Sequence, residues 1–175
     1  LTVYRKLFPE DHPDVARIMN RIGFWLTEAG QYAEADEDLS AALAMRRRLF
    51  GETHPEVATS LIHLAILRIA QHDYRSALTS STAAVEILAH ALSPTHWKTA
   101  VGESAEGAAL AGLGRPGEAR PLLARSIAIL AKDGGAPPEY HRLAVRYLAG
   151  IQGSKSAPGN PERPEGNPVG RTAPP

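Results

Sequence analysis

The sequence repeats with a period of 42 residues, and this repeat limits the fold more than any other feature. His12, His54 and His96 occupy one register, and residues 1–16 agree with residues 43–58 at nine of sixteen positions. Other positions keep the same spacing: Tyr32 and Tyr74; Ala35, Ala77 and Ala119; Leu43, Val85 and Ile127; Phe8, Phe50 and Leu92. A repeat of this length is a supersecondary unit that buries its apolar face only by stacking on its neighbours.

Each repeat predicts a pair of helices. Apolar residues recur at helical spacing in two successive segments, first Val15, Ile18, Met19, Ile22 and Leu26, then Leu39, Ala42, Leu43 and Leu49. Pro13 and Pro55 suit the first turn of a helix, where the missing amide has no intrahelical partner. Asp11 and Thr53 come just before and are the expected N-caps, and Gly30 is the expected end of a first helix.

Small residues fall where the two helices of a pair must meet. Gly23 and Ala65 lie midway along first helices, and Ala35, Ala77 and Ala119 lie early in second helices. A larger side chain at these places would hold the helices apart and cost roughly 1–3 kcal/mol in strain. The pattern therefore predicts closely packed helical hairpins.

The repeat divides the chain into an array and two ends. We expect residues 1–8 to end a truncated repeat, residues 9–150 to form the array, and the Gly- and Pro-rich residues 151–175 to be a disordered tail. The expected elements of the array are hairpins at 13–50, 55–91 and 96–132 and a last helix from Pro137 and Pro138 to about Gly150. That helix would cover the apolar face of the final hairpin. Since the first residue is leucine, we expect the chain to be a piece of a longer protein.

The composition argues against several classes of partner. Hydrophobic residues make up 43% and charged residues 22%, and 19 basic residues balance 19 acidic ones. A neutral chain has no long-range field that gathers nucleic acid or anionic lipid, and no run reaches the roughly 18 apolar residues of a membrane span. Cysteine is absent, which excludes disulfides and thiolate metal sites and suits a reducing compartment. We expect a cytoplasmic protein with no nucleic-acid partner and no membrane insertion.

Neither a metal site nor a catalytic site is predicted. His12, His54 and His96 belong to different hairpins, whose helices pack ~8–10 Å apart, too far for one ion. We expect these histidines at turns and helix starts instead. Nucleophile and phosphate-binding motifs are missing, and the glycines of residues 112–117 follow a helix rather than a strand. We therefore expect no cofactor and no catalysis by this chain.

Two further features each have two interpretations. The arginines at residues 46–48 form either a phosphate patch or a solvated helix face, and the acidic residues within 34–38 of the same helix favour the solvated face. Phe24, Trp25 and Trp97 either stack on a ligand or pack in the core and between repeats, and packing is the commoner fate.

Two motifs resemble a known repeat family. Residues 30–35, Gly-Gln-Tyr-Ala-Glu-Ala, are similar to the turn of the tetratricopeptide pattern, and residues 49–58, LFGETHPEVA, resemble its kinesin-light-chain subtype. The resemblance covers residues 1 to about 150 and implies an all-α fold, a right-handed superhelical solenoid of antiparallel helix hairpins. The positions that depart from the subtype are Arg21, His63 and Ala105, where asparagine is usual, and Pro116, where an aromatic residue is usual.

A narrower resemblance concerns bacterial signalling. Residues 96–98, 111–115 and 118–123 are similar to the closing repeats of large bacterial serine/threonine protein kinases, in which such repeats follow the kinase domain. The chain itself carries no kinase motif. The resemblance implies that the chain is the C-terminal repeat region of such a kinase.

The family resemblance also implies a binding groove lined by the first helix of each pair. The groove residues are Arg17, Asn20, Arg21, Phe24, Glu28, Thr59, Ile62, His63, Ile66, Ile69, Val101, Ser104, Ala105 and Ala108. We hypothesise that the groove binds an extended or helical peptide, with an acidic group near Arg17 and Arg21 and apolar groups near Ile62, Ile66 and Val101. The alternative is that these residues only pack between repeats.

Three functions remain open on this basis. The first is a scaffold that binds a peptide or partner protein in the groove. The second is the regulatory or substrate-recruiting region of a kinase whose catalytic domain lies upstream. The third is an array that mediates self-association.

Overall fold

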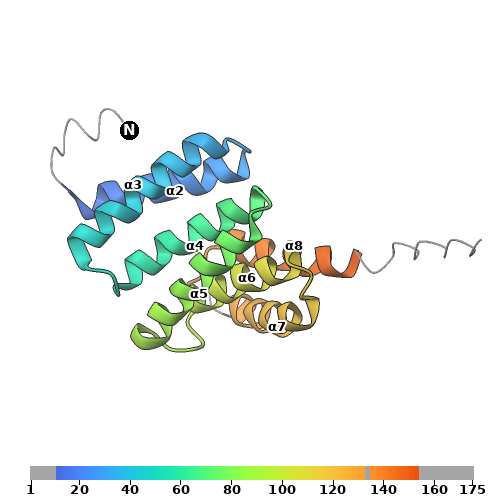
Figure 1. The fold of residues 1–175 in the computed structure, drawn as a ribbon. Coiled ribbons are helices and arrows are strands. Elements are labelled where there is room, and N and C mark those ends of the chain that lie inside the picture. Colours follow the sequence, from blue (N-terminus) through green and yellow to red (C-terminus); the bar gives the residue numbers. More distant parts are fainter. Residues whose placement is uncertain (1–10, 133–134, 154–175) are drawn as a thin grey trace, which may run out of the picture.

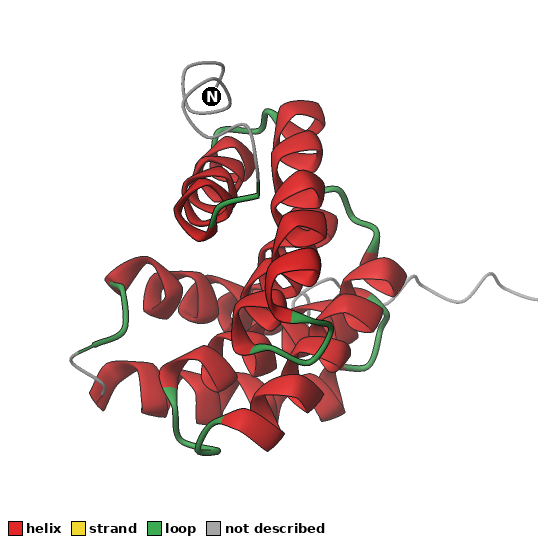
Figure 2. Cartoon of the chain, turned by 90° about the vertical axis from the view of Figure 1, so that its left-hand side faces the viewer, coloured by secondary structure: helices red, strands yellow, loops and turns green. Residues whose placement is uncertain are grey.

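The computed structural model describes residues 11–132 and 135–153, and all regular structure within these ranges is helical (Figure 1, Figure 2). The helices are α2 (Pro13–Glu28), α3 (Tyr32–Phe50), α4 (Pro55–Ala70), α5 (Tyr74–Ala91), α6 (Trp97–Gly112), α7 (Pro116–Lys132) and α8 (Pro138–Gly153). Helices α2 and α3, α4 and α5, and α6 and α7 form hairpins that stack from one end of the molecule to the other (Figure 1). The predicted all-α repeat solenoid is confirmed.

The predicted ends of the chain are only partly accessible to comparison. The truncated repeat at residues 1–8 and most of the tail at residues 151–175 lie outside the described residues. Residues 151–153, which were expected in the tail, form the last turn of α8 instead. The side chain of Ile151 is buried there, which explains why the helix continues past Gly150.

Histidine caps the first helix of every hairpin. Nδ1 of His12, His54 and His96 accepts the backbone N–H two residues further on, at 3.2, 3.1 and 3.1 Å. The expected caps Asp11 and Thr53 were therefore wrong by one residue. The helix start that was expected for the three repeated histidines is confirmed.

The turns inside the hairpins also repeat. Gly30, His72 and Gly114 lie 42 residues apart, and each has a positive φ, of 77°, 62° and 76°. In each turn the next residue donates its N–H to a carbonyl five residues earlier, as in the bond from Gln31 to Leu26. This left-handed geometry favours glycine, so His72 is the one strained member of the set.

Within a hairpin the helices approach as closely as the small residues predicted. A Cβ atom on Gly23 would lie 2.6 Å from Leu39 Cγ, and one on Gly107 would lie 2.9 Å from Leu123 Cγ. Both distances are too short for a real contact. The two glycines are therefore required for the packing of α2 on α3 and of α6 on α7.

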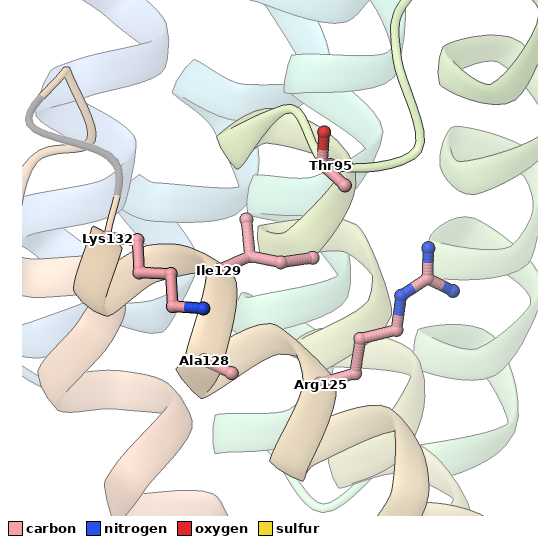
Figure 3. A pocket seen from close by; sticks show the side chains of 5 residues that line it. All are labelled: Thr95, Arg125, Ala128, Ile129 and Lys132. Carbon is pink, nitrogen blue, oxygen red and sulfur yellow. The ribbon is translucent and has the colours of Figure 1, made fainter.

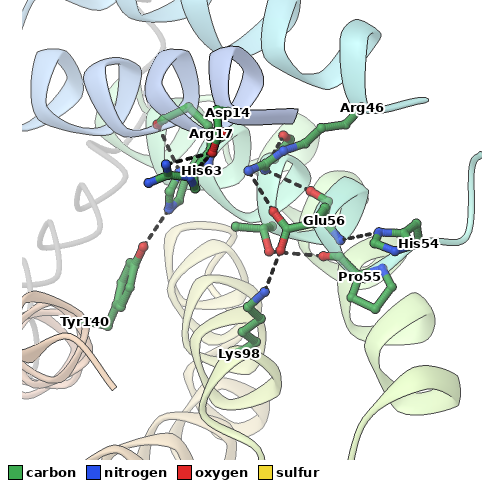
Figure 4. Close-up of polar contacts among 12 residues, drawn as sticks. Asp14, Arg17, Arg46, His54, Pro55, Glu56, His63, Lys98 and Tyr140 are labelled. Atoms are coloured by element: carbon green, nitrogen blue, oxygen red, sulfur yellow. Dashed lines mark hydrogen bonds and ion pairs between the residues drawn. The ribbon is translucent and has the colours of Figure 1, made fainter. Parts of the chain in front are cut away.

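A series of charged side chains links successive hairpins. Arg46 on α3 is buried, and its guanidinium donates to the Glu56 backbone oxygen and to Ser60 Oγ, each at 2.9 Å, and pairs with the Glu56 carboxylate at 2.8 Å. Lys98 on α6 donates to the same carboxylate at 2.8 Å (Figure 4). Burial alone would raise the pKa of Glu56, but the hydrogen bond from Lys98 and the charge of Arg46 lower it.

The predicted solvated face of residues 46–48 is wrong for Arg46, which is buried, although Arg47 and Arg48 are exposed.

Candidate partner-binding face

The first helices of the three hairpins lie side by side and form one surface, which we call the first-helix face (α2, α4 and α6). Every predicted groove residue lies on one of these helices, but their exposure differs. Those on the α2 side that are exposed are Arg17, Arg21 and Glu28; those partly buried are Thr59 and Ile69; those buried are Asn20, Phe24, Ile62, His63, Ile66, Val101, Ser104, Ala105 and Ala108. The structure thus brings the set together on one face, and most of that face is covered.

Helix α8 covers it. The apolar cluster at α8 includes Tyr140, Leu143 and Ala144 of α8 with Phe24, Ile62, Ile66, Ala100, Val101 and Ala105 of the first-helix face. The last helix was expected to cover only the final hairpin. It contacts α6 and α7 of that hairpin but also reaches side chains of α2 and α4.

A buried polar cluster joins α2, α4 and α8. The hydroxyl of Tyr140 lies 2.8 Å from Nε2 of His63 (Figure 4). The amide nitrogen of Asn20 lies 2.6 Å from Nδ1 of the same ring. Burial, together with the charge of Arg46, lowers the pKa of His63 to about 4, so the ring is neutral at physiological pH. Burial also raises the pKa of Tyr140 to about 12. The side-chain oxygen of Asn20 is buried and has no hydrogen-bond partner.

An ion pair links α8 to the C-terminal end of α2. Arg146 Nη2 donates to Glu28 Oε1 at 2.9 Å, across 118 residues of sequence. This hydrogen bond raises the pKa of the Arg146 guanidinium. Glu28, predicted as a groove residue, is therefore already paired with a residue of the chain itself.

One accessible part of the face is a crevice between α2 and α8. A cavity of about 230 Å³ lies there, lined by Phe24, Trp25 and Glu28 of α2 and by Glu139, Arg142, Leu143 and Arg146 of α8. Trp25 lines this cavity and is 49% exposed, so its predicted packing in the core is wrong. Phe24 is buried and Trp97 is half-buried. Within the described part of the chain, Arg21 and Arg142 are exposed and form no ion pair.

Two larger hollows lie away from Trp25. One of about 450 Å³ lies where α4, α6 and α8 end, lined by Ile69, Ala108, Ala111, Tyr147 and Gly150 among others. The other, of about 500 Å³, opens on α7 between Thr95, Arg125, Ala128, Ile129 and Lys132 (Figure 3). Arg125 there already pairs with Glu103 at 3.1 Å, and none of the predicted groove residues lines this hollow.

Two other kinds of site were sought in residues 11–132 and 135–153. No group of three or more His, Asp or Glu side chains in this part of the chain is placed to hold a metal ion. No helix among the described residues has the length and apolar character needed to cross a membrane.

Comparison with known proteins identifies the repeat. Residues 14–90 match the family described as tetratricopeptide repeat. This part of the chain thus carries tetratricopeptide repeats. No curated protein sequence matches it significantly. Proteins of this family usually serve as scaffolds for protein–protein interaction, so the coarse functional prediction agrees with the family.

Solved structures of tetratricopeptide-like proteins share the fold. A protein from Chlorobium tepidum matches with a TM-score of 0.63 and 20% identity, over 79% of this chain and 94% of its own. A putative kinesin light chain from Podospora anserina with nearly identical repeats matches with a TM-score of 0.62 and 23% identity, over 88% of this chain and 81% of its own. A single-residue variant of that light chain matches with a TM-score of 0.60 and 24% identity, over 87% of this chain and 80% of its own.

Sequence reasoning missed the contribution of α8 to this face. Tyr140, Leu143, Ala144, Tyr147 and Ile151 recur at helical spacing, so an apolar stripe was visible in the sequence. The stripe does not reveal which surface it covers. That choice depends on side chains from α2, α4 and α6, which are up to 118 residues away.

Proposed function

We propose that this chain is a protein–protein interaction scaffold whose partner docks at the α2 side of the first-helix face. The observation that carries the proposal is the 49% exposure of Trp25 beside the crevice between α2 and α8. Tryptophan and arginine are the residues that most often dominate binding energy at protein interfaces. A large aromatic side chain left half in water, with a cavity next to it, is typical of such an anchor.

Two basic side chains beside Trp25, Arg21 and Arg142, outnumber Glu139, the one acidic side chain there that forms no salt bridge within the described part of the chain, and they favour a partner segment with a carboxylate. Arg21 of α2 and Arg142 of α8 are exposed and lack an ion pair among the described residues. Arg17, which was predicted to share this role, is engaged by Asp14 at 2.8 Å. The acidic group of the hypothesised peptide is therefore proposed near Arg21 and Arg142 rather than near Arg17.

The test uses peptides selected on the protein from a random-peptide display library. Trp25→Ala should weaken their binding about tenfold or more, since interface tryptophans contribute roughly 2 kcal/mol. Arg21→Glu should weaken it less and mainly slow association, because an exposed charge acts on the encounter. Arg75→Glu, an exposed arginine on α5 outside this face, is the matched control.

Calorimetry and binding kinetics measure these changes, and circular dichroism checks that each variant is folded. Selected peptides that bind Trp25→Ala and Arg21→Glu as tightly as the parent would contradict the proposed docking site.

Ile62→Glu does not test the docking site. Ile62 is 2% exposed, so a charge at this position would unfold the array rather than report on binding.

A finer proposal concerns the parent protein. The similarity of residues 96–98, 111–115 and 118–123 to closing repeats of bacterial kinases supports a role as the regulatory or substrate-recruiting region of a cytoplasmic signalling kinase. Sequencing the DNA upstream of the codon for Leu1 tests it. A kinase domain followed by further 42-residue repeats would support this role, and repeats alone back to a start codon would contradict it.

A further inference from the structure

We infer that α8 acts as an intrachain ligand of the first-helix face, and that the face binds an amphipathic helix of a partner protein with the same side-chain stripe once α8 leaves. The inference rests on the proposed scaffold function and concerns the part of the first-helix face that α8 covers, next to the crevice at Trp25. Its basis is that a helix already lies on this face through contacts that a second helix can reproduce.

The stripe of α8 is well defined. Tyr140, Leu143, Ala144 and Ile151 are buried on one side of the helix, with Tyr147 partly buried between them. Val145 lies outside this stripe and is 43% exposed. This is the arrangement by which an amphipathic helix binds in a groove of another protein, with anchors at i, i+3, i+4 and i+7.

The contacts of α8 extend further than an end cap requires. Covering the last hairpin needs only contacts with α6 and α7. Tyr140 instead reaches His63 on α4 and lies with its ring centroid 5.7 Å from that of Phe24 on α2. Arg146 reaches Glu28, also on α2. These contacts engage individual side chains of the first-helix face, as a ligand does.

The fit of α8 leaves room for a better ligand. The Asn20 side-chain oxygen beneath it has no partner, which costs free energy at a buried position. The cavity of about 450 Å³ at the end of α8 is lined by small residues of the face, Ala108 and Ala111, and by Gly150 of α8. A Cβ atom on Gly150 would meet nothing within 4 Å. A larger apolar side chain at this position therefore has space.

These contacts define the chemistry of the partner helix. It carries an aromatic residue with a hydrogen-bonding group for His63, then leucine and alanine one turn later, then a basic residue for Glu28. A large apolar residue at the place of Gly150 improves the fit. The tethered α8 competes with such a helix, because its effective concentration far exceeds that of a free ligand.

The experiment uses the full chain and a fluorescent peptide of residues 137–153, the α8 peptide. Leu143→Glu places a charge on the buried stripe and releases α8 while leaving the first-helix face intact. The α8 peptide should bind Leu143→Glu about tenfold or more tightly than the parent, since the competing state is removed. Val145→Glu adds the same charge on the exposed side of α8 and should bind like the parent.

Release of α8 has its own readout. The rings of Trp97 and Tyr140 stack with centroids 5.9 Å apart, so Trp97 fluorescence in a Trp25→Phe background reports whether α8 is docked. Circular dichroism shows whether the three hairpins stay helical. If Leu143→Glu unfolds them, Arg146→Glu provides the milder release, because it opposes Glu28 with a like charge.

A charge exchange tests whether the peptide takes the place of α8. In the Leu143→Glu chain, adding Glu28→Arg should weaken binding of the α8 peptide. A peptide with Arg146→Glu should restore it. A merely sticky surface would not show this exchange.

Three results would overturn the inference. One is failure of the α8 peptide to bind a chain in which Trp97 reports α8 released. Another is equal binding by Val145→Glu and Leu143→Glu. The third is a parent dimer, seen by light scattering, that Leu143→Glu dissolves, since the occupant would then be a second copy. None of these results touches the binding of selected peptides at Trp25, so failure of the proposed function is recognised separately.

Discussion

Helices α2 and α6 occupy the same place in their repeats, but α2 carries large side chains on the first-helix face and α6 carries small residues. Where α2 carries Arg21, Phe24 and Glu28, the 42-residue register gives α6 the small residues Ala105, Ala108 and Gly112. The backbone of α8 lies close to α6, whereas its contacts with α2 are made through long side chains such as Arg146. Side-chain size at shared positions therefore decides whether the backbone of α8 lies close to the first helix, as at α6, or at a distance bridged by long side chains, as at α2.

The largest effect of pH on stability is expected at His63, at the junction between the α2 and α6 surfaces. His63 lies under Tyr140, and its pKa is lowered from 6.5 to about 4 by burial and by Arg46. Between these values the unfolded chain binds the proton and the folded chain does not. Protonation of His63 should therefore reduce the free energy of unfolding as the pH falls below 6.5. The reduction should reach up to roughly 3 kcal/mol toward pH 4.

Urea unfolding at several pH values measures this dependence, and His63→Gln is the control. The difference in unfolding free energy between parent and variant should shrink as the pH falls from 6.5 to 4. A difference that stays constant over that range would show that His63 titrates normally in the folded protein.

The next prediction compares the same register on the two helices. Ala105→Leu should destabilise the fold by about 2 kcal/mol, because Ala105 is fully buried under α8 and the added atoms have no space. Arg21→Leu adds an apolar side chain at the matching position of α2, which is exposed, and should change the stability by less than about 0.5 kcal/mol. Equal effects in urea unfolding would mean that the two ends of the face are not packed differently.

The helices themselves were predictable because several local signals agreed. The period, the prolines at 13 and 55 and the small residue at position 23 all placed the same hairpins, and the observed helices start at those prolines. The helix caps were not predicted correctly, since a histidine caps a helix less often than aspartate or threonine does. The repetition of His12, His54 and His96 was nevertheless the signal that marked these starts.

The site was less predictable because it depends on contacts between distant elements. Arg46 follows Leu39, Ala42 and Leu43 at helical spacing, so its burial was visible in the pattern, but its two arginine neighbours hid it. The position of α8 had no such local signal. It follows from the small residues of α6 together with the reach of Tyr140 and Arg146, and only a folded chain brings these together.

A smaller effect is expected at the turns, where the middle repeat differs from its neighbours. His72 has a φ of 62° at the position that Gly30 and Gly114 fill in the other hairpins. His72→Gly should stabilise the protein by about 0.5–1 kcal/mol, since relief of the left-handed strain exceeds the entropy cost of glycine. Thermal unfolding measures it, with Gly30→Ala as the converse change that should destabilise. Stabilisation by Gly30→Ala would show that these turns carry no strain.

The smallest effect concerns how firmly the C-terminal end of α8 is held on the first-helix face. Gly150→Ala should raise stability by about 0.5 kcal/mol, because alanine favours a helix and the new methyl group meets no atom within 4 Å. Gly117→Ala on α7 is the matched control, since it also adds a methyl group to a helix in open space. Both changes should slow global unfolding, but only Gly150→Ala should slow amide hydrogen exchange specifically in α8 and weaken binding of the α8 peptide. If Gly117→Ala weakens peptide binding equally, the effect belongs to the stability of the whole array, and α8 does not compete for the face on its own.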